Sequence, residues 1–154
     1  MTYGELGRHG EAICLRQDIY SAYLRLEGEE SEDTLRAAFN YANSLAHLER
    51  NAEAKVLMRK TLPVARRVLG KSHRVSLGMG WRYARLLFED DGATLADLRE
   101  AVSTLVESEP TARRVFGGAH PNTKKIERDL REARAALRGA NANESHFPIG
   151  TQVS

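Results

Sequence analysis

The sequence predicts an all-α fold made of repeated pairs of antiparallel helices, and three observations lead to this prediction. Short groups of residues recur along the chain, first 42 and then 47 positions apart. Between these marks, apolar residues follow the three-to-four spacing of a buried helix face. Each unit ends on a glycine (Gly28, Gly70 and Gly117), the residue type that most often closes a helix C-terminus.

The composition is that of a soluble chain with one domain. It has 154 residues, of which 42% are hydrophobic and 29% charged, and its formal net charge is +2. This length allows a real core, and the balanced charge argues against a protein that coats nucleic acid. No long apolar run or apolar leader occurs, so we expect no membrane partner and a cytoplasmic location. The single cysteine, Cys14, fits a reducing compartment, and its neighbours Ile13 and Leu15 predict that it is buried.

Matching residues set the register of the repeat. The offset of 42 changes to 47 after Leu87, which predicts a five-residue insertion near 90–94. The register also places a proline twice in the second helix of a pair, which predicts a kink or a break there. The matching sets are Glu11, Glu53 and Glu100; Thr34 and Ser76; Tyr41 and Tyr83; Pro63 and Pro110; His73 and His120.

In chain order, this register divides most of the chain into four parts of one helical domain. The full repeats contain helix pairs expected over 33–48 with 52–69 and over 75–116. The last helix begins at Pro121, and charged residues surround its narrow apolar stripe, as expected at the end of an array. Residues 139–154 show no periodicity and are expected to form a tail. The parts of the domain (1–138) are a half repeat at 5–28, a repeat at 31–70, a repeat at 73–117 and a capping helix at 120–138.

The linkers between the predicted pairs resemble those of a known family. Gly70-Lys71-Ser72-His73 and the segment from Gly117 to Thr123 are similar to the Gly-x-x-His-Pro-x-Thr linker of the tetratricopeptide repeat, in its 42-residue kinesin-light-chain variant. The resemblance covers about residues 5–137. It implies a right-handed superhelix of antiparallel helix pairs, in which the first helices of the pairs line a concave groove suited to an extended peptide.

On the family's register, side chains from the predicted first helices and from the capping helix face this groove. Asparagine amides can bond a peptide backbone, and arginine offers a planar fork to carboxylates. The two aromatic residues would form apolar pockets, or else pack between helices. The predicted binding residues are Arg36, Phe39, Asn40, Asn43, His47, Trp81, Arg82, Arg85, Lys125 and Arg128.

Charge is segregated along the chain. Between Lys55 and Phe88 there are nine Lys or Arg residues and no Asp or Glu, whereas 27–33 holds five acidic residues. Such a pattern attracts an acidic partner, or another copy of the chain, to the middle of the array.

We therefore expect a non-catalytic protein-interaction scaffold that holds a peptide segment, of acidic character, in its groove. The sequence has no phosphate-binding loop, nucleophile elbow or zinc-protease motif, so we expect no enzyme and no cofactor. His73 and His120 occupy successive repeats, too far apart to share a metal, and are expected to bond local backbone. One alternative is a structural subunit that self-associates through open repeat ends. Another is RNA binding through the basic stretch, which the small net charge argues against.

Overall fold

A computed structural model of the chain describes the backbone of residues 3–145 and the side chains of residues 7–144. Within that range the fold is all-α, without a strand, which confirms the all-α part of the predicted fold class. The helices are α1 (Tyr3–Glu27), α2 (Glu32–His47), α3 (Asn51–Val68), α4 (Arg74–Phe88), α5 (Leu95–Phe116) and α6 (Pro121–Ser145).

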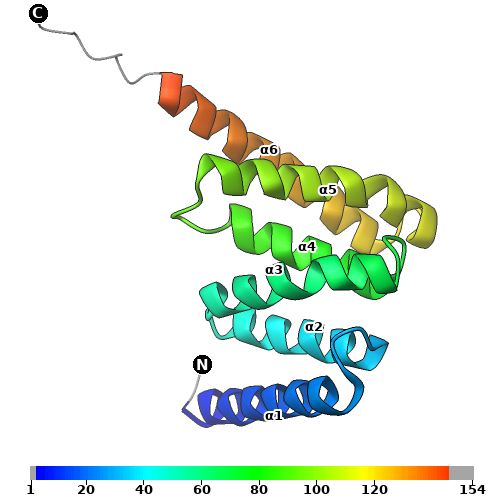
Figure 1. The fold of residues 1–154 in the computed structure, drawn as a ribbon. Coiled ribbons are helices and arrows are strands. Elements are labelled where there is room, and N and C mark those ends of the chain that lie inside the picture. Colours follow the sequence, from blue (N-terminus) through cyan, green and yellow to red (C-terminus); the bar gives the residue numbers. More distant parts are fainter. Residues whose placement is uncertain (1–2, 146–154) are drawn as a thin grey trace, which may run out of the picture.

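The helices stack in chain order, from α1 at one end to α6 at the other (Figure 1). Each helix packs on its neighbours along the chain, and α4 also contacts both α2 and α6. The even-numbered helices therefore form a row, while α3 and α5 each bridge two members of it. Helix α1 packs on α2 alone. This arrangement leaves one face of the row free of the odd-numbered helices.

Glycine turns close three of the helices in the same way. Gly28, Gly70 and Gly117 have φ angles of 85°, 92° and 94°, in the left-handed region that costs an L-residue free energy. They follow α1, α3 and α5, the three helices that precede a member of the row. The glycine recurrence in the sequence thus corresponds to a recurring turn of the backbone.

The histidines after two of these turns cap the next helix. Nδ1 of His73 accepts a hydrogen bond of 3.1 Å from the backbone N–H of Val75, and Nδ1 of His120 accepts one of 3.1 Å from Asn122. A side-chain acceptor at this place satisfies a backbone donor that the first turn of a helix leaves free. The prediction that both histidines bond local backbone is confirmed.

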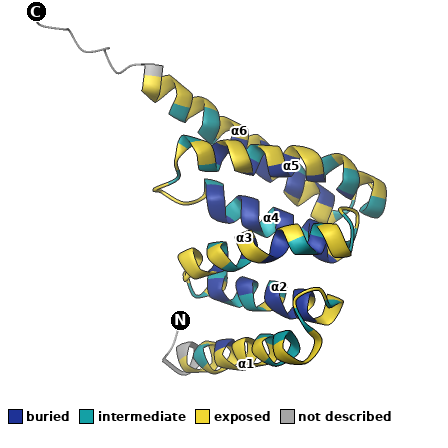
Figure 2. Cartoon of the chain, in the orientation of Figure 1, coloured by how far each residue is buried: buried dark blue, intermediate teal, exposed yellow. Residues whose placement is uncertain are grey.

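One turn further on, a buried hydroxyl ties α4 to α3 and α6 to α5, whereas the equivalent hydroxyl of Thr34 in α2 has no hydrogen-bond partner among the described residues. Ser76 donates to the carbonyl oxygen of Ala65 at 3.2 Å, and Thr123 donates to that of Ala112 at 3.3 Å. Thr34, at the same place in α2, is equally buried. Small buried residues elsewhere in the repeat let the helices approach closely around a core of Leu and Met side chains. The buried positions lie mainly where the helices of the stack meet (Figure 2).

Helices α3 and α5 continue through Pro63 and Pro110, so the break that was one of the two predicted outcomes does not occur, and the kink stays a prediction. Both prolines are exposed, so water can satisfy the carbonyls they leave unbonded. Two other sequence expectations differ from the structure. Residues 139–145 continue α6 instead of joining a tail, since an exposed alanine-containing segment extends a helix without an apolar stripe. Residues 146–154 lie outside the described part.

Cys14 is exposed, because Ile13 occupies the face of α1 that meets α2.

Candidate functional site

A pocket of about 230 Å³ opens on the row formed by α2, α4 and α6. Apolar side chains make most of its wall, and cationic side chains stand at its edge. The lining residues are Phe39, Arg74, Leu77, Gly78, Trp81, Phe116, Asn122, Lys125 and Ile126.

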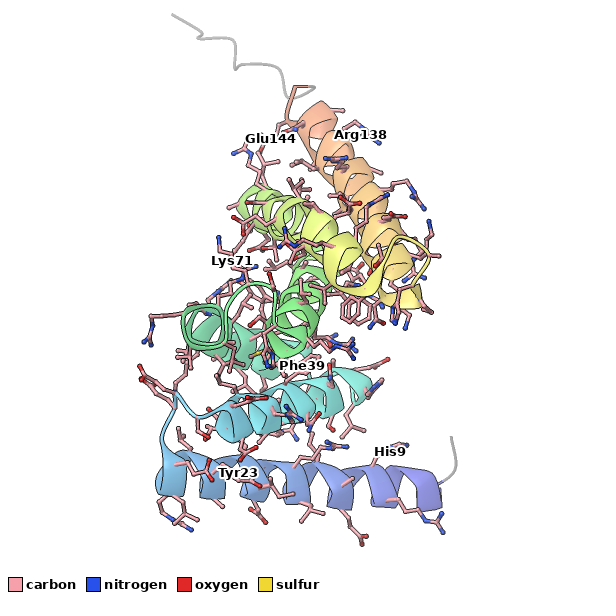
Figure 3. All side chains as sticks on the ribbon, turned by 90° about the vertical axis from the view of Figure 1, so that its right-hand side faces the viewer. His9, Tyr23, Phe39, Lys71, Arg138 and Glu144 are labelled. Carbon is pink, nitrogen blue, oxygen red and sulfur yellow. The ribbon has the colours of Figure 1, made fainter. Side chains whose placement is uncertain are left out.

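The floor of the pocket depends on a close approach between α2 and α4. A Cβ atom placed on Gly78 would lie 2.8 Å from Cζ of Phe39, which is too short for a real contact. Figure 3 shows Phe39 on the side of α2 nearest α4. Glycine in a helix interior costs about 1 kcal/mol relative to alanine. Here it gives the Phe39 ring the space in which it lies.

Trp81 is the centre of the charged part of the site. Its indole N–H donates a hydrogen bond of 2.6 Å to Oδ2 of Asp129 on α6. Three cations lie over its ring, with Arg82, Arg85 and Lys125 at 5.2, 5.3 and 5.8 Å from the centroid. Each such cation–π contact stabilises an exposed pair by about 0.5–1 kcal/mol. The indole is therefore held between α4 and α6, close to three positive charges.

Asp129 is the buried anion that holds this cluster together. Its side chain is 1% exposed. In addition to its bond with Trp81, Oδ2 of Asp129 lies 3.7 Å from Nε of Arg85, and Oδ1 accepts a hydrogen bond of 3.2 Å from Nε of Arg128. A buried carboxylate needs such partners, because an unpaired buried charge costs several kcal/mol. Asp129 thus aligns Trp81 and two arginines at the junction of α4 and α6.

The positive charge around the pocket exceeds what this carboxylate neutralises. Nε of Arg82 donates a hydrogen bond of 2.8 Å to Oδ1 of Asn43 on α2. Burial, and then the charge of Arg85, lowers the pKa of Arg82, which means that its cationic form is held at a cost. Within the described residues, no carboxylate oxygen lies within 4.0 Å of a charged nitrogen of Arg74, Arg82 or Lys125. In the part of the chain that is described, these three cations are therefore left without a carboxylate at ion-pair distance.

The structure brings most of the predicted binding residues to this site. Phe39, Trp81 and Lys125 line the pocket. Beside it, Asn43, Arg82, Arg85 and Arg128 join the cluster around Trp81 and Asp129.

Three of the predicted residues lie apart from the pocket. Arg36 pairs with Glu32 at 2.6 Å and lines a second, shallower hollow beside Phe39. Asn40 and His47 are exposed and line neither of these two hollows. The side chains of the two are therefore separate from the cluster that Trp81 and Asp129 form.

Sequence reasoning missed Asp129 and Phe116. Asp129 stands in the repeat register of Asn40 and Arg82, so the register itself could have placed it on the row. Phe116 comes from the last turn of α5, where its ring stacks on His120 at 4.8 Å and lies under Arg74 at 5.2 Å. Its position directly before the predicted Gly117 turn could have indicated that its ring lies near the start of the next helix.

The chain shows no match to a model of a known protein family, and no curated protein resembles it detectably in sequence. Within the described part of the chain, no three His, Cys, Asp or Glu side chains lie close enough together to hold a metal ion. None of the helices described combines the length and the apolar content needed to cross a bilayer.

Proposed function

We propose that this chain is a tetratricopeptide-like interaction module that binds an acidic peptide along the row of α2, α4 and α6. The observation that carries the proposal is the apolar pocket beside cations that have no carboxylate partner. At about 230 Å³ it is smaller than the roughly 300–1,000 Å³ of sites for whole small molecules. It suits one large apolar side chain of a peptide whose acidic residues lie on either side.

The repeated turns support the finer architecture that this proposal uses. A left-handed glycine, a linker and a capping histidine recur before α4 and again before α6. Identical joints rotate successive pairs by similar amounts, which is how helical repeats generate a superhelix with a concave face. In the proposed right-handed superhelix, α2, α4 and α6 are the inner helices.

Charge and rigidity both favour this ligand. Arg74 and Lys125 both line the pocket, so a peptide bound there meets two cations. Trp81 is already fixed by Asp129, and binding therefore costs little side-chain entropy there. Aromatic and arginine residues of this kind dominate the binding energy of many interfaces.

The test uses Trp81, the single tryptophan of the chain, as a fluorescent reporter. The probe is a synthetic peptide of Asp, Glu and Ser residues around one central Leu. We expect saturable changes in Trp81 emission with a Kd on the order of 1–100 μM that weakens with added salt. A peptide with Ser in place of Leu, and one with Lys in place of the acids, should both bind at least roughly tenfold more weakly.

Two variants locate the binding surface. Lys125→Glu should weaken binding of the acidic peptide roughly tenfold or more, since it replaces a cation at the pocket with an anion. Lys60→Glu makes the same charge change on α3, away from the pocket, and should leave the affinity within about twofold. Equal losses in the two variants, or neither an emission change nor calorimetric heat with the acidic peptide, would contradict the proposal.

A further inference from the structure

Helix α1 carries an apolar stripe that no other described part of the chain covers. Its members are spaced alternately three and four residues apart, the spacing of a helix seam that pairs with another helix. Leu15, Ile19 and Leu26 are 60%, 41% and 76% exposed. The opposite side of α1, with Ile13, faces α2, and the outward side of α1 is largely exposed in Figure 2. The stripe consists of Ala12, Leu15, Ile19, Ala22 and Leu26.

Two positions of the stripe, those of Ala12 and Ile19, are buried in both α3 and α5, whereas the counterpart of Leu26 in α3, Val68, is 40% exposed. Ala12 is exposed, whereas its counterparts Ala54 and Ala101 have no exposed surface. Ile19 is 41% exposed, whereas its counterparts Thr61 and Ser108 are about as buried as the core. The reason is that α3 and α5 each lie between two helices of the row, while α1 contacts only α2. The part of the stripe around Ala12 and Ile19 is therefore a face of α1 that lacks the partner helix present in α3 and α5.

Another helix of the row type is a poor partner for this face. Arg16 stands where Met58 and Leu105 are fully buried in α3 and α5. A helix packed on α1 in the ordinary way would bury the Arg16 charge without a carboxylate. The partner must therefore pack on the side of α1 that carries Leu15, Ile19 and Leu26 and not over Arg16.

The far end of the stack does not complement the stripe either. The side of α6 that would meet a following helix carries Glu127, Arg131 and Arg134. The same positions are small or apolar in the other two helices of the row: Ala38, Ala42 and Leu45 in α2, and Gly80, Ala84 and Leu87 in α4. Head-to-tail association of copies would bury these charged side chains of α6 against the apolar stripe of α1. Removing the charges from water costs more free energy than this contact returns, so the copies do not form an open chain.

We propose that the stripe binds the same stripe of a second copy, with the two α1 helices antiparallel about a two-fold axis. In this register Ile19 lies opposite the partner's Ala22, and Leu15 lies opposite the partner's Leu26. The flanking positions then bring Asp18 next to the partner's Arg25, twice by symmetry. Asp18 and Arg25 are exposed and have no ion pair among the described residues. A parallel pairing would separate these charges.

Association of the full chain gives the first measurement. Light scattering and sedimentation equilibrium should give a mass of about twice 17.2 kDa at tens of micromolar protein, with dissociation on dilution. Leu15→Glu combined with Ile19→Glu should give a monomer with unchanged helix content, because both side chains are already exposed. Val56→Glu, at an equally exposed apolar position on α3, should leave the dimer intact. A wild-type monomer at every concentration, or assemblies that grow beyond the dimer, would overturn the proposal.

Exchange of the two flanking charges tests the orientation. Asp18→Arg alone and Arg25→Asp alone each create two like-charge contacts and should weaken the dimer about tenfold. The double variant restores two opposite-charge contacts and should dimerise as the wild type does. An equimolar mixture of the two single variants should form a heterodimer in preference to either homodimer. If the double variant is as weak as the singles, the antiparallel register is wrong.

Discussion

The helix pairs α2–α3 and α4–α5 share their joints but differ in their groove chemistry. Both are followed by a left-handed glycine and a buried hydroxyl on the next helix. On the groove side, Phe39 and Asn40 of α2 correspond to Trp81 and Arg82 of α4. Of the two helix pairs, only α4–α5 contacts the buried carboxylate of Asp129, through Trp81 and Arg85. The joints that repeat build the stack, and the positions that vary decide where along it a ligand can bind.

The insertion after α4 is the other difference between the pairs. Residues 89–94 take the place of the short turn that joins α2 to α3. At their end, the Thr94 side chain accepts a hydrogen bond from the backbone N–H of Asp97, and the Asp97 side chain accepts one from the backbone N–H of Thr94. Such a cap satisfies two backbone donors at once and fixes where α5 begins. The insertion therefore lengthens the linker without shifting the register of α5 against α4, as the equivalent burial of Ala54 and Ala101 indicates.

The largest expected effect comes from the position at which the pairs differ most. Asp129→Ala should lower the free energy of unfolding by about 3 kcal/mol, because the Trp81 N–H and Arg85 lose a buried partner. Asp129→Asn keeps an acceptor oxygen and should lose less. Asn40→Ala, in the same register but exposed, should change stability by less than about 0.5 kcal/mol. Urea denaturation measures all three, and a similar loss at both positions would contradict the assigned role of Asp129.

The all-α class, the glycine turns and the histidine bonds could be predicted because they depend on local chemistry that the repeat displays twice. Trp81 and Phe39 could be placed on the row by register alone. The burial of Asp129 could not be predicted from the sequence. A buried aspartate on a helix rich in charged residues has the same neighbours in sequence as an aspartate that is exposed to solvent. The burial of Asp129 depends on Trp81, 48 residues away. Likewise, the outward direction of Cys14 depends on which face of α1 meets α2.

The capping histidines offer a comparison among the linkers. His73→Ala and His120→Ala should each lower the free energy of unfolding by about 1 kcal/mol, because each removes the acceptor for a backbone N–H. Ser31 occupies the same place before α2 but makes no side-chain cap and instead donates to Glu27 at 2.5 Å. Ser31→Ala should therefore cost less than either histidine variant in chemical denaturation. The reverse order would show that capping is not what these histidines contribute.

The two glycines inside α4 should respond differently to alanine. Gly80→Ala should stabilise the protein by up to about 1 kcal/mol, because the added Cβ meets nothing closer than 3.4 Å. Gly78→Ala gains the same helix propensity but displaces the Phe39 ring, so its net effect should be smaller by about 1 kcal/mol. In a Phe39→Ala background the two alanine variants should become equivalent. A double-mutant cycle in urea measures this coupling, and additive effects would show that Phe39 and Gly78 do not depend on each other.

The smallest expected effect concerns the insertion that only the second pair has. Lys55 of α3 reaches Asp90 at 2.9 Å, and this bond, together with the Gly92 N–H, holds the pKa of Asp90 below its usual 3.8. The lowered pKa means that the contact stabilises the fold above pH 3.8 and is lost as the pH falls further. Both side chains are near solvent, so the loss is small. Asp90→Asn should flatten the acid side of the stability profile slightly, as measured by urea denaturation at a series of pH values below about pH 5. An acid slope as steep as that of the wild type would mean that the Lys55 contact does not persist in solution, and that the insertion is held by the Thr94 cap alone.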